Sequence, residues 1–265
     1  MMLRALSMIV VSMSLFLVGC ATVVPPPVVA PASATDAEAA WGRVLQRFVN
    51  ERGEVDFQAL SQDRSDLDRY VRYVADAPLA EPGTGGSAQA AQLAHMINAY
   101  NALSMFNVVA SGIPATHAGF NKVGFFYLRK LAVGGQVMSL YAFENEVIRP
   151  FTRRIGEPRV HFALNCSARA CPVLPRVPFS GPRLGEQLER ETRAFFAQPR
   201  NFRIDDATRT VWLSEILNFY PEDFVPEHAP SLVAYANRYA PQAAPLDYTL
   251  RLTPYDWTVA NSQAR

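Results

Sequence analysis

The stretch RVHFALNCSARACPVL, from Arg159 to Leu174, carries the densest chemistry of the chain. Three apolar residues, Val160, Phe162 and Leu164, occupy every second position, and this period of two predicts a half-buried strand. His161 then points to the opposite face of that strand. The stretch therefore predicts an imidazole on a strand that leads directly into a turn.

Two cysteines, Cys166 and Cys171, bracket the turn, and Pro172 prevents the backbone from continuing as an inner strand. A disulfide requires Cα atoms within about 4.4–6.8 Å of each other, and a turn this short can supply that separation. We therefore predict that the two sulfurs lie within disulfide reach and that His161 faces the same pocket as Glu144.

The chain is 49% hydrophobic and 18% charged over 265 residues, which is typical of a globular protein. Residues 1–19 carry one charge, Arg4, before a long apolar run, and this pattern predicts a secretory signal peptide. The run ends in LVGC, Leu17 to Cys20, which resembles a bacterial lipobox. The resemblance implies a lipid on Cys20, and Ala21 behind it implies retention at the outer membrane, facing the periplasm.

Charge balance bears on the partners. Arg4 is the only one of the 25 Lys and Arg residues in the signal, so 24 remain beside 24 Asp and Glu residues, and the mature chain has no net charge. No basic stripe is present to bind phosphates, so we expect no nucleic-acid partner. The expected attachment is to a membrane through the lipid on Cys20, and a small-molecule, peptide or protein partner is left open.

We expect the lipidated cysteine and a proline-rich spacer over residues 20–33, followed by one compact domain over residues 34–261. The expected fold is α+β, with a central, mostly antiparallel sheet flanked by helices. Helices are predicted from about residue 36 to near Gly53 and near residues 65–77, 140–149, 183–197 and 231–239. Hairpins are predicted over residues 131–138 and 202–213, with a last strand over residues 248–253.

Residues 91–110 are apolar on nearly every side and predict one buried helix. Asn98 and Asn101 interrupt it, and buried amides must be hydrogen-bonded or they destabilise the fold. We expect them to brace neighbouring loops through backbone bonds. The alternative is that they line a pocket and bind a ligand.

Five motifs, in this order, resemble the domain-of-unknown-function 547 family. They are INAYNAL (Ile97 to Leu103), GGQVMSLYAFENEVIRP (Gly134 to Pro150), HFALNCSARACPVL (His161 to Leu174), LSEILNFYPEDF (Leu213 to Phe224) and YDWTVAN (Tyr255 to Asn261). The resemblance spans most of the mature chain and implies functional polar residues at Asn98, Asn101, Glu144, His161, Cys166, Cys171 and Ser214. It implies no established activity, although relatives that carry a glutaredoxin module beside this domain point to thiol chemistry.

Two functions stay open. In an enzyme, His161 holds Cys166 as a thiolate, and Glu144 or Asn98 orients the imidazole. In a binding or scaffolding lipoprotein, Cys166 and Cys171 form a structural disulfide, which an oxidising periplasm favours.

Two further expectations concern architecture and cofactors. The buried helix before a histidine-bearing strand resembles papain-like and transglutaminase-like folds. Those folds place the nucleophilic cysteine on the helix, where this chain has asparagines. His161 and the two cysteines supply at most three ligands from one segment, so we expect no metal and no cofactor.

Overall fold

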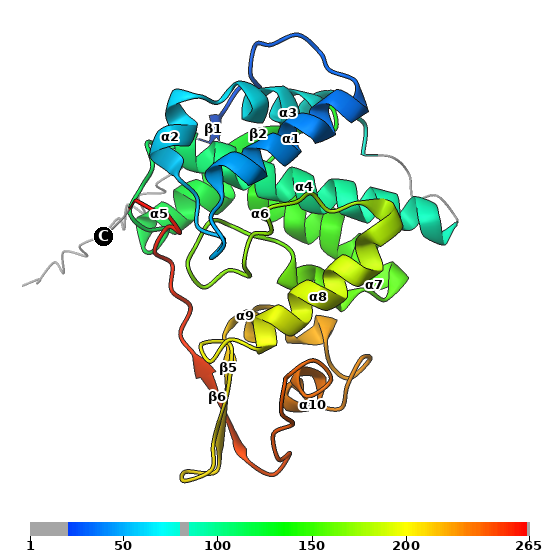
Figure 1. Ribbon diagram of the computed structural model, residues 1–265, viewed down its shortest axis with the longest axis vertical. Helices are drawn as coiled ribbons and strands as arrows, with labels where there is room; N and C mark the ends of the chain where they lie inside the picture. Colours follow the sequence, from blue (N-terminus) through cyan, green and yellow to red (C-terminus); the bar gives the residue numbers. More distant parts are fainter. Residues whose placement is uncertain (1–20, 80–84, 264–265) are drawn as a thin grey trace, which may run out of the picture.

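The computed structural model describes residues 21–79 and 85–263, so the predicted lipidation site, Cys20, lies outside the described residues. Figure 1 shows the long helix α4 (Gly86–Ala110) at the centre, with α1 (Ala34–Phe48) and α3 (Ser65–Asp76) on one side and α8 (Leu184–Phe196) on the other. Of the 25 residues of α4, 15 are buried, because the helix has no polar face to turn toward water.

The amphipathic helices form where the apolar spacing predicts them. Helix α1 begins behind Ser33, whose side chain accepts a hydrogen bond from the Asp36 N–H, and α3 and α8 each bury one apolar face. The shorter α-helices are α2 (Phe57–Gln62), α5 (Phe120–Val123), α6 (Leu140–Ala142), α7 (Arg149–Ile155), α9 (Ile216–Phe219) and α10 (Leu232–Ala236).

Strands form two small sheets instead of the one central sheet expected. The first joins β1 (Thr22–Val23), β2 (Arg129–Val133) and β3 (Gln136–Met138), and the second joins β4 (Phe202–Asp205), β5 (Thr210–Ser214) and β6 (Thr249–Thr253). Each contains one antiparallel and one parallel pair. The α+β class and both hairpins are confirmed, and Figure 1 shows the second sheet at the end of the molecule away from α1.

The predicted strand around His161 is wrong. Residues Pro158–Phe162 form a 3₁₀ helix, which the Glu157 side chain caps by accepting the Arg159 N–H. Val160, His161 and Phe162 are all buried in this helix, so the alternation of apolar and polar residues does not mark a buried and an exposed face.

The predicted helix behind Ser139 is longer than expected. The Ser139 hydroxyl accepts the Ala142 N–H and caps α6, as the sequence indicates. The chain then makes a π-helical turn over Phe143–Ile148 and continues as α7 through Pro150 to Ile155. Pro150 is the second residue of α7 and directly follows the wider π-helical turn, and it does not end the helix. The π-helical turn contains Glu144, and such turns are frequent at functional sites.

The start of the proline-rich spacer is bound to the domain. Thr22 and Val23 pair with Arg129 and Lys130 in a parallel bridge, and the Val24 N–H donates to the Lys130 carbonyl at 2.8 Å. The described part of the chain contains no helix that is both long enough and apolar enough to cross a membrane.

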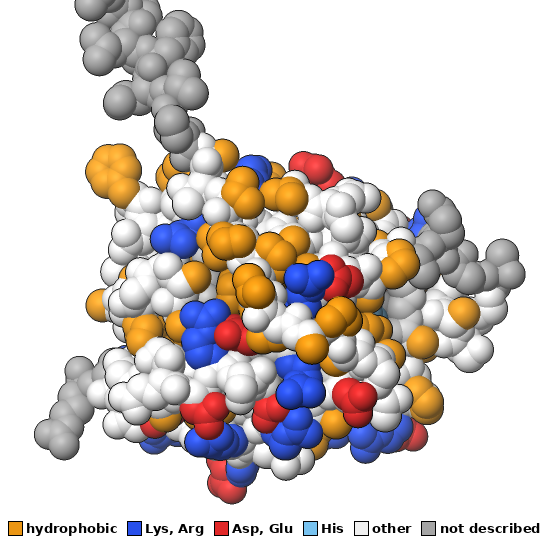
Figure 2. Space-filling model, turned by 90° about the horizontal axis from the view of Figure 1, so that it is seen from above, with side chains coloured by type: hydrophobic (Ala, Val, Ile, Leu, Met, Phe, Trp, Pro, Cys, Tyr) orange, Lys and Arg blue, Asp and Glu red, His pale blue; other side chains and the backbone are white. Residues whose placement is uncertain are grey.

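Mixed charges cover the outer side of α1 and α3. Arg43 pairs with Asp66 at 2.5 Å and Arg47 pairs with Asp63 at 2.5 Å, both largely exposed. On the face seen in Figure 2, Lys and Arg side chains lie among Asp and Glu side chains, around a central group of apolar ones. Exposed pairs of this kind contribute little to stability, so the buried core around α4 must supply most of it.

The last segment of the chain holds the site together. Tyr255 to Asn261 runs between the loop at residues 115–117 and the cysteine turn. Bridges join Thr258 to Thr116 and Val259 to Ala168. This placement carries the side chains of Tyr255 and Trp257 to the sulfurs, which lie 84 or more residues earlier in the sequence.

Candidate functional site

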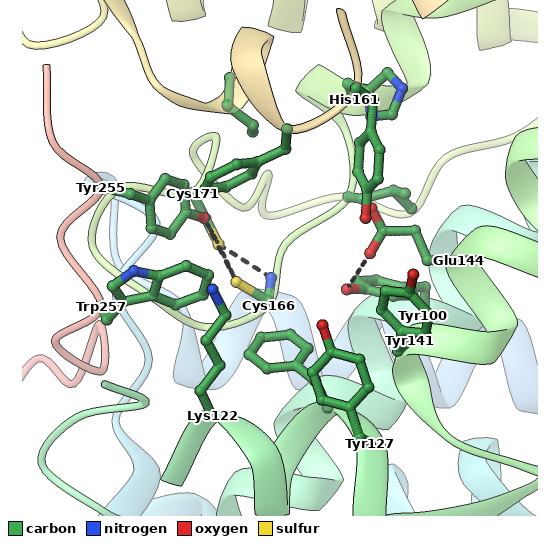
Figure 3. A pocket seen from close by; sticks show the side chains of 15 residues that line it. Tyr100, Lys122, Tyr127, Tyr141, Glu144, His161, Cys166, Cys171, Tyr255 and Trp257 are labelled. Atoms are coloured by element: carbon green, nitrogen blue, oxygen red, sulfur yellow. Dashed lines mark hydrogen bonds between the residues drawn. The ribbon is translucent and has the colours of Figure 1, made fainter. Parts of the chain in front are cut away.

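A pocket of about 320 Å³ opens beside α4 and contains the sequence-predicted residues His161, Cys166 and Glu144. Figure 3 shows the two sulfurs on one wall and Glu144 on the wall opposite, with open space between them. Its lining is mostly aromatic, and the full set is Tyr100, Lys122, Phe126, Tyr127, Tyr141, Glu144, His161, Leu164, Cys166, Cys171, Ile216, Phe219, Tyr220, Tyr255 and Trp257.

The cysteine turn is braced by asparagines. The Asn165 side chain donates to the Pro172 carbonyl at 2.7 Å and accepts the Ser167 N–H at 2.7 Å, and Ser167 adopts a left-handed backbone with φ of 65°. Asn101 on α4 accepts the Asn165 N–H at 2.7 Å. These bonds fold residues 165–172 into a closed loop, and the loop sets the two cysteines side by side.

Both cysteines are free thiols in the structure, with their Sγ atoms 2.8 Å apart. A disulfide bond is about 2.05 Å long, so the sulfurs are in contact but not bonded. The predicted proximity is therefore confirmed, whereas the disulfide itself stays a prediction.

The two thiols differ in their hydrogen bonds. The Cys171 sulfur accepts the Cys166 N–H at 3.1 Å and the Tyr255 hydroxyl at 3.0 Å. Burial opposes ionisation of Cys171, but the hydrogen bonds from Cys166 and Tyr255 outweigh it and lower the pKa of the Cys171 thiol. The hydrogen bond to Cys171, together with burial, raises the pKa of the Cys166 thiol. Of the two thiols, Cys171 is therefore the one that ionises more readily, and Cys166 is the one that keeps its proton more readily.

The Tyr255 hydroxyl remains a donor across the whole physiological range. Burial, with the nearby sulfurs, raises the pKa of Tyr255 well above its ordinary value. Its ring packs against Trp257 with centroids 4.4 Å apart and against Phe219 at 5.2 Å. A rigid aromatic wall thus aims one hydroxyl at the sulfur pair.

Glu144 lies on the opposite wall. The Tyr100 hydroxyl donates to its Oε2 at 2.8 Å. Burial raises the pKa of the Glu144 carboxyl, although His161, Tyr100 and Arg149 act against the rise. A carboxyl in this state can give or take a proton nearer neutral pH than an exposed glutamate can.

His161 is directed away from the sulfurs. Its Nε2 lies 2.8 Å from Asp223 Oδ2, and its ring stacks on Tyr220 with centroids 5.3 Å apart. Arg149 donates to the same carboxylate at 2.7 Å, and Arg153 donates to Oδ1.

The arginine contacts fix the state of the pair. Desolvation works against a charged Asp223, but the bonds from His161, Arg149 and Arg153 lower the pKa of Asp223, so it is a carboxylate and His161 Nε2 is the donor. Among the described residues, His161 forms no hydrogen bond with either cysteine or with Glu144, so the expected contact between His161 and Cys166 is absent.

Three residues expected to bind a ligand lie outside the pocket lining. Asn98 bonds to Trp41 and to both backbone groups of Phe179. Asn101 donates to the Ala163 carbonyl at 3.0 Å, and Ser214 accepts the Ile216 N–H at 3.4 Å. The asparagines are buried and bonded inside the protein, which confirms the bracing interpretation.

Several residues that line the pocket or bond to its lining were missed by sequence reasoning. Tyr255 and Trp257 lie in the motif YDWTVAN, and Asp223 lies in the motif LSEILNFYPEDF. The resemblance of both motifs to the family was the signal that could have identified these residues. Lys122 had no such signal, because it lies in none of the five motifs. Among residues 21–79 and 85–263, no group of three or more His, Cys, Asp or Glu residues is arranged to hold a metal ion.

Comparison with known proteins gives one match. Residues 86–196 match the model of the family described as "Protein of unknown function, DUF547", and this match supports membership of that family. The matched segment runs from the start of α4 to the end of α8 and includes Glu144, His161 and both cysteines. No curated protein and no solved structure matches the chain, so no resemblance to papain-like folds is shown.

Proposed function

We propose that this chain is a lipid-anchored protein of the bacterial cell envelope whose pocket performs thiol–disulfide exchange at Cys166 and Cys171. One observation carries the proposal: two sulfurs in contact lie in the wall of an open pocket, and their hydrogen bonds favour a thiolate on one and a proton on the other. A thiolate beside a protonated partner is the arrangement that attacks a disulfide and then resolves the product.

The chemistry is a two-electron exchange. The Cys171 thiolate attacks one sulfur of a substrate disulfide, forms a mixed disulfide and releases the first substrate thiolate. Cys166 then attacks the Cys171 sulfur and releases the second half of the substrate. One product carries the proton of Cys166 and the other leaves as a thiolate, so the substrate is reduced while the protein pair is oxidised to a disulfide. In reverse, the oxidised pair oxidises a substrate dithiol.

The opposite wall has a supporting role in this proposal. Glu144 lies on that wall, where burial raises the pKa of its carboxyl and the Tyr100 hydroxyl donates to it. His161 is a positioning residue, because its bond to Asp223 and its stacking on Tyr220 hold that wall in place.

A second candidate is a binding lipoprotein in which the pair is a structural disulfide. The low exposure of the sulfurs favours it, since Cys166 is 8% exposed and Cys171 is 3% exposed. The braced turn also favours it, because a rigid loop holds both cysteines at bonding distance.

Mapping of alkylation tests which cysteine reacts. When the reduced, folded protein is treated with limiting iodoacetamide near neutral pH, we expect peptide mass mapping to find most of the label on Cys171. Tyr255→Phe should slow this labelling by about threefold, because loss of one hydrogen bond raises the thiol pKa, while the greater nucleophilicity of the thiolate offsets part of the loss. Tyr73→Phe, which removes a hydroxyl outside the pocket, serves as the control. Preferential labelling of Cys166, or no effect of Tyr255→Phe, contradicts the assignment.

The cell-envelope part of the proposal rests on the lipobox at Leu17 to Cys20. A Cys20→Ser chain should lose its lipid and leave the membrane fraction. If this variant is processed and fractionates like the unchanged chain, the anchor lies elsewhere.

A further inference from the structure

Lys122 is one of two lysines in the chain and the only one in the pocket lining described above. Its ammonium lies 4.1 Å from the centroid of the Trp257 ring and 5.9 Å from that of Phe219. Within the described part of the chain, it forms no ion pair with a carboxylate. Figure 3 shows the side chain directed toward Trp257, on the side of the pocket that holds the sulfurs.

Contacts connect this ammonium with the sulfur pair. Trp257, under the ammonium, packs against Tyr255 with ring centroids 4.4 Å apart, and the Tyr255 hydroxyl contacts Cys171 at 3.0 Å. A positive charge therefore lies on the same side of the pocket as the sulfur that a substrate disulfide must reach. An ammonium over an aromatic face is held in position by the ring and still presents its outer hydrogens to a ligand.

Apart from the Cys171 sulfur, the other titratable groups of the pocket are turned away from this cation. Glu144 is on the opposite wall and bonds to Tyr100, and His161 turns its Nε2 to Asp223. Because Glu144 lies across the pocket from Lys122, an anion bound to the ammonium stays away from that carboxyl.

We propose that Lys122 selects disulfide substrates that carry a carboxylate close to the disulfide, with the carboxylate on the Lys122 ammonium and the disulfide on Cys171. The aromatic walls receive the apolar part of such a substrate. This inference rests on the proposed thiol–disulfide function, and it adds the chemical class of the substrate.

Two aromatic disulfide probes of different charge separate the inference from the function. Dithiobis(nitrobenzoic acid) carries carboxylates, whereas dithiodipyridine is uncharged at neutral pH. The reduced protein is mixed with each probe, and the rate of release of the coloured thiol is measured. We expect Lys122→Met to lower the ratio of the two rates, anionic over neutral, by about fivefold, the effect of one partly exposed ion pair. Raising the salt concentration should lower the same ratio for the unchanged protein.

Lys130→Met is the matched control, because Lys130 lies in β2 and not in the pocket lining. It should leave the ratio unchanged. If Lys122→Met slows both probes equally, Lys122 acts on the thiolate and not on the substrate, and the inference is overturned. If the ratio does not change with Lys122→Met, the inference is also overturned. If neither probe reacts with Cys171 in the unchanged, reduced protein, the thiol–disulfide function itself is wrong.

Discussion

The Cys171→Ala variant should reduce disulfides at least about tenfold more slowly than the unchanged protein, because the attacking sulfur is gone and burial still raises the pKa of the remaining thiol, Cys166. The matched Cys166→Ala variant should behave differently. It keeps the attacking sulfur and the Tyr255 hydroxyl that contacts it. It should therefore complete the first attack and stop there.

Dithiodipyridine distinguishes these outcomes by the amount of thiol released. The unchanged, reduced protein should release two equivalents of thiopyridone per chain, since Cys166 resolves the mixed disulfide. Cys166→Ala should release one equivalent and retain the other half of the probe on Cys171, which mass spectrometry detects. Thermal melts of both variants show whether each remains folded. Equal reactivity of the two variants, or a mixed disulfide formed only on Cys166, contradicts the assigned roles.

The Asn98→Leu variant should lose about 3 kcal/mol or more of the free energy of unfolding, because three buried groups lose their partner. The Asn98 Oδ1 accepts the Trp41 indole N–H at 3.3 Å and the Phe179 N–H at 3.0 Å, and its Nδ2 donates to the Phe179 carbonyl at 2.8 Å. A leucine of similar size fills the space but satisfies none of these groups. The side chain thus joins α4 to α1 and to the segment that leads into α8.

Denaturant unfolding measures this loss. Asn218→Leu is the control, because Asn218 is exposed on α9 and the same exchange there should change the free energy of unfolding by less than about 0.5 kcal/mol. Similar losses in the two variants contradict the role of Asn98 as a brace.

Local patterns in the sequence predict much of the secondary structure. The apolar spacing of α3 and α8, the Gly134-Gly135 turn between β2 and β3, and the Ser139 cap all describe interactions between residues close in sequence. Such interactions are readable without the fold.

The segment around His161 was misread because its backbone bonds are made by a distant helix. Asn101 donates to the Ala163 carbonyl and accepts the Asn165 N–H, so these groups are satisfied by a side chain instead of a neighbouring strand. The alternation of apolar residues is the same in either case. The contact with α4 is tertiary and has no local signature, whereas the Glu157 cap and Pro158 at the start of the 3₁₀ helix are local features.

The candidate site was predictable in part for the same reason. Cys166 and Cys171 lie close in sequence, so their proximity followed from the turn between them. Tyr255 follows the cysteines and Lys122 precedes them, each by more than 40 residues. Their positions in the pocket depend on the bridges that join the C-terminal segment to the loops at residues 115–117 and 167–170. Pairing of that kind depends on the whole fold, and one sequence does not specify it locally.

The reduction potential of the Cys166–Cys171 pair is the most direct test of thiol–disulfide exchange at this site. The purified protein is equilibrated in mixtures of reduced and oxidised glutathione, quenched with a thiol-blocking reagent and scored by mass for free and bonded cysteines. We predict a reversible transition of both cysteines between about −270 and −120 mV, the range of thiol–disulfide oxidoreductases. A pair that stays bonded down to potentials below about −300 mV is a structural disulfide, and that result would contradict the proposed function.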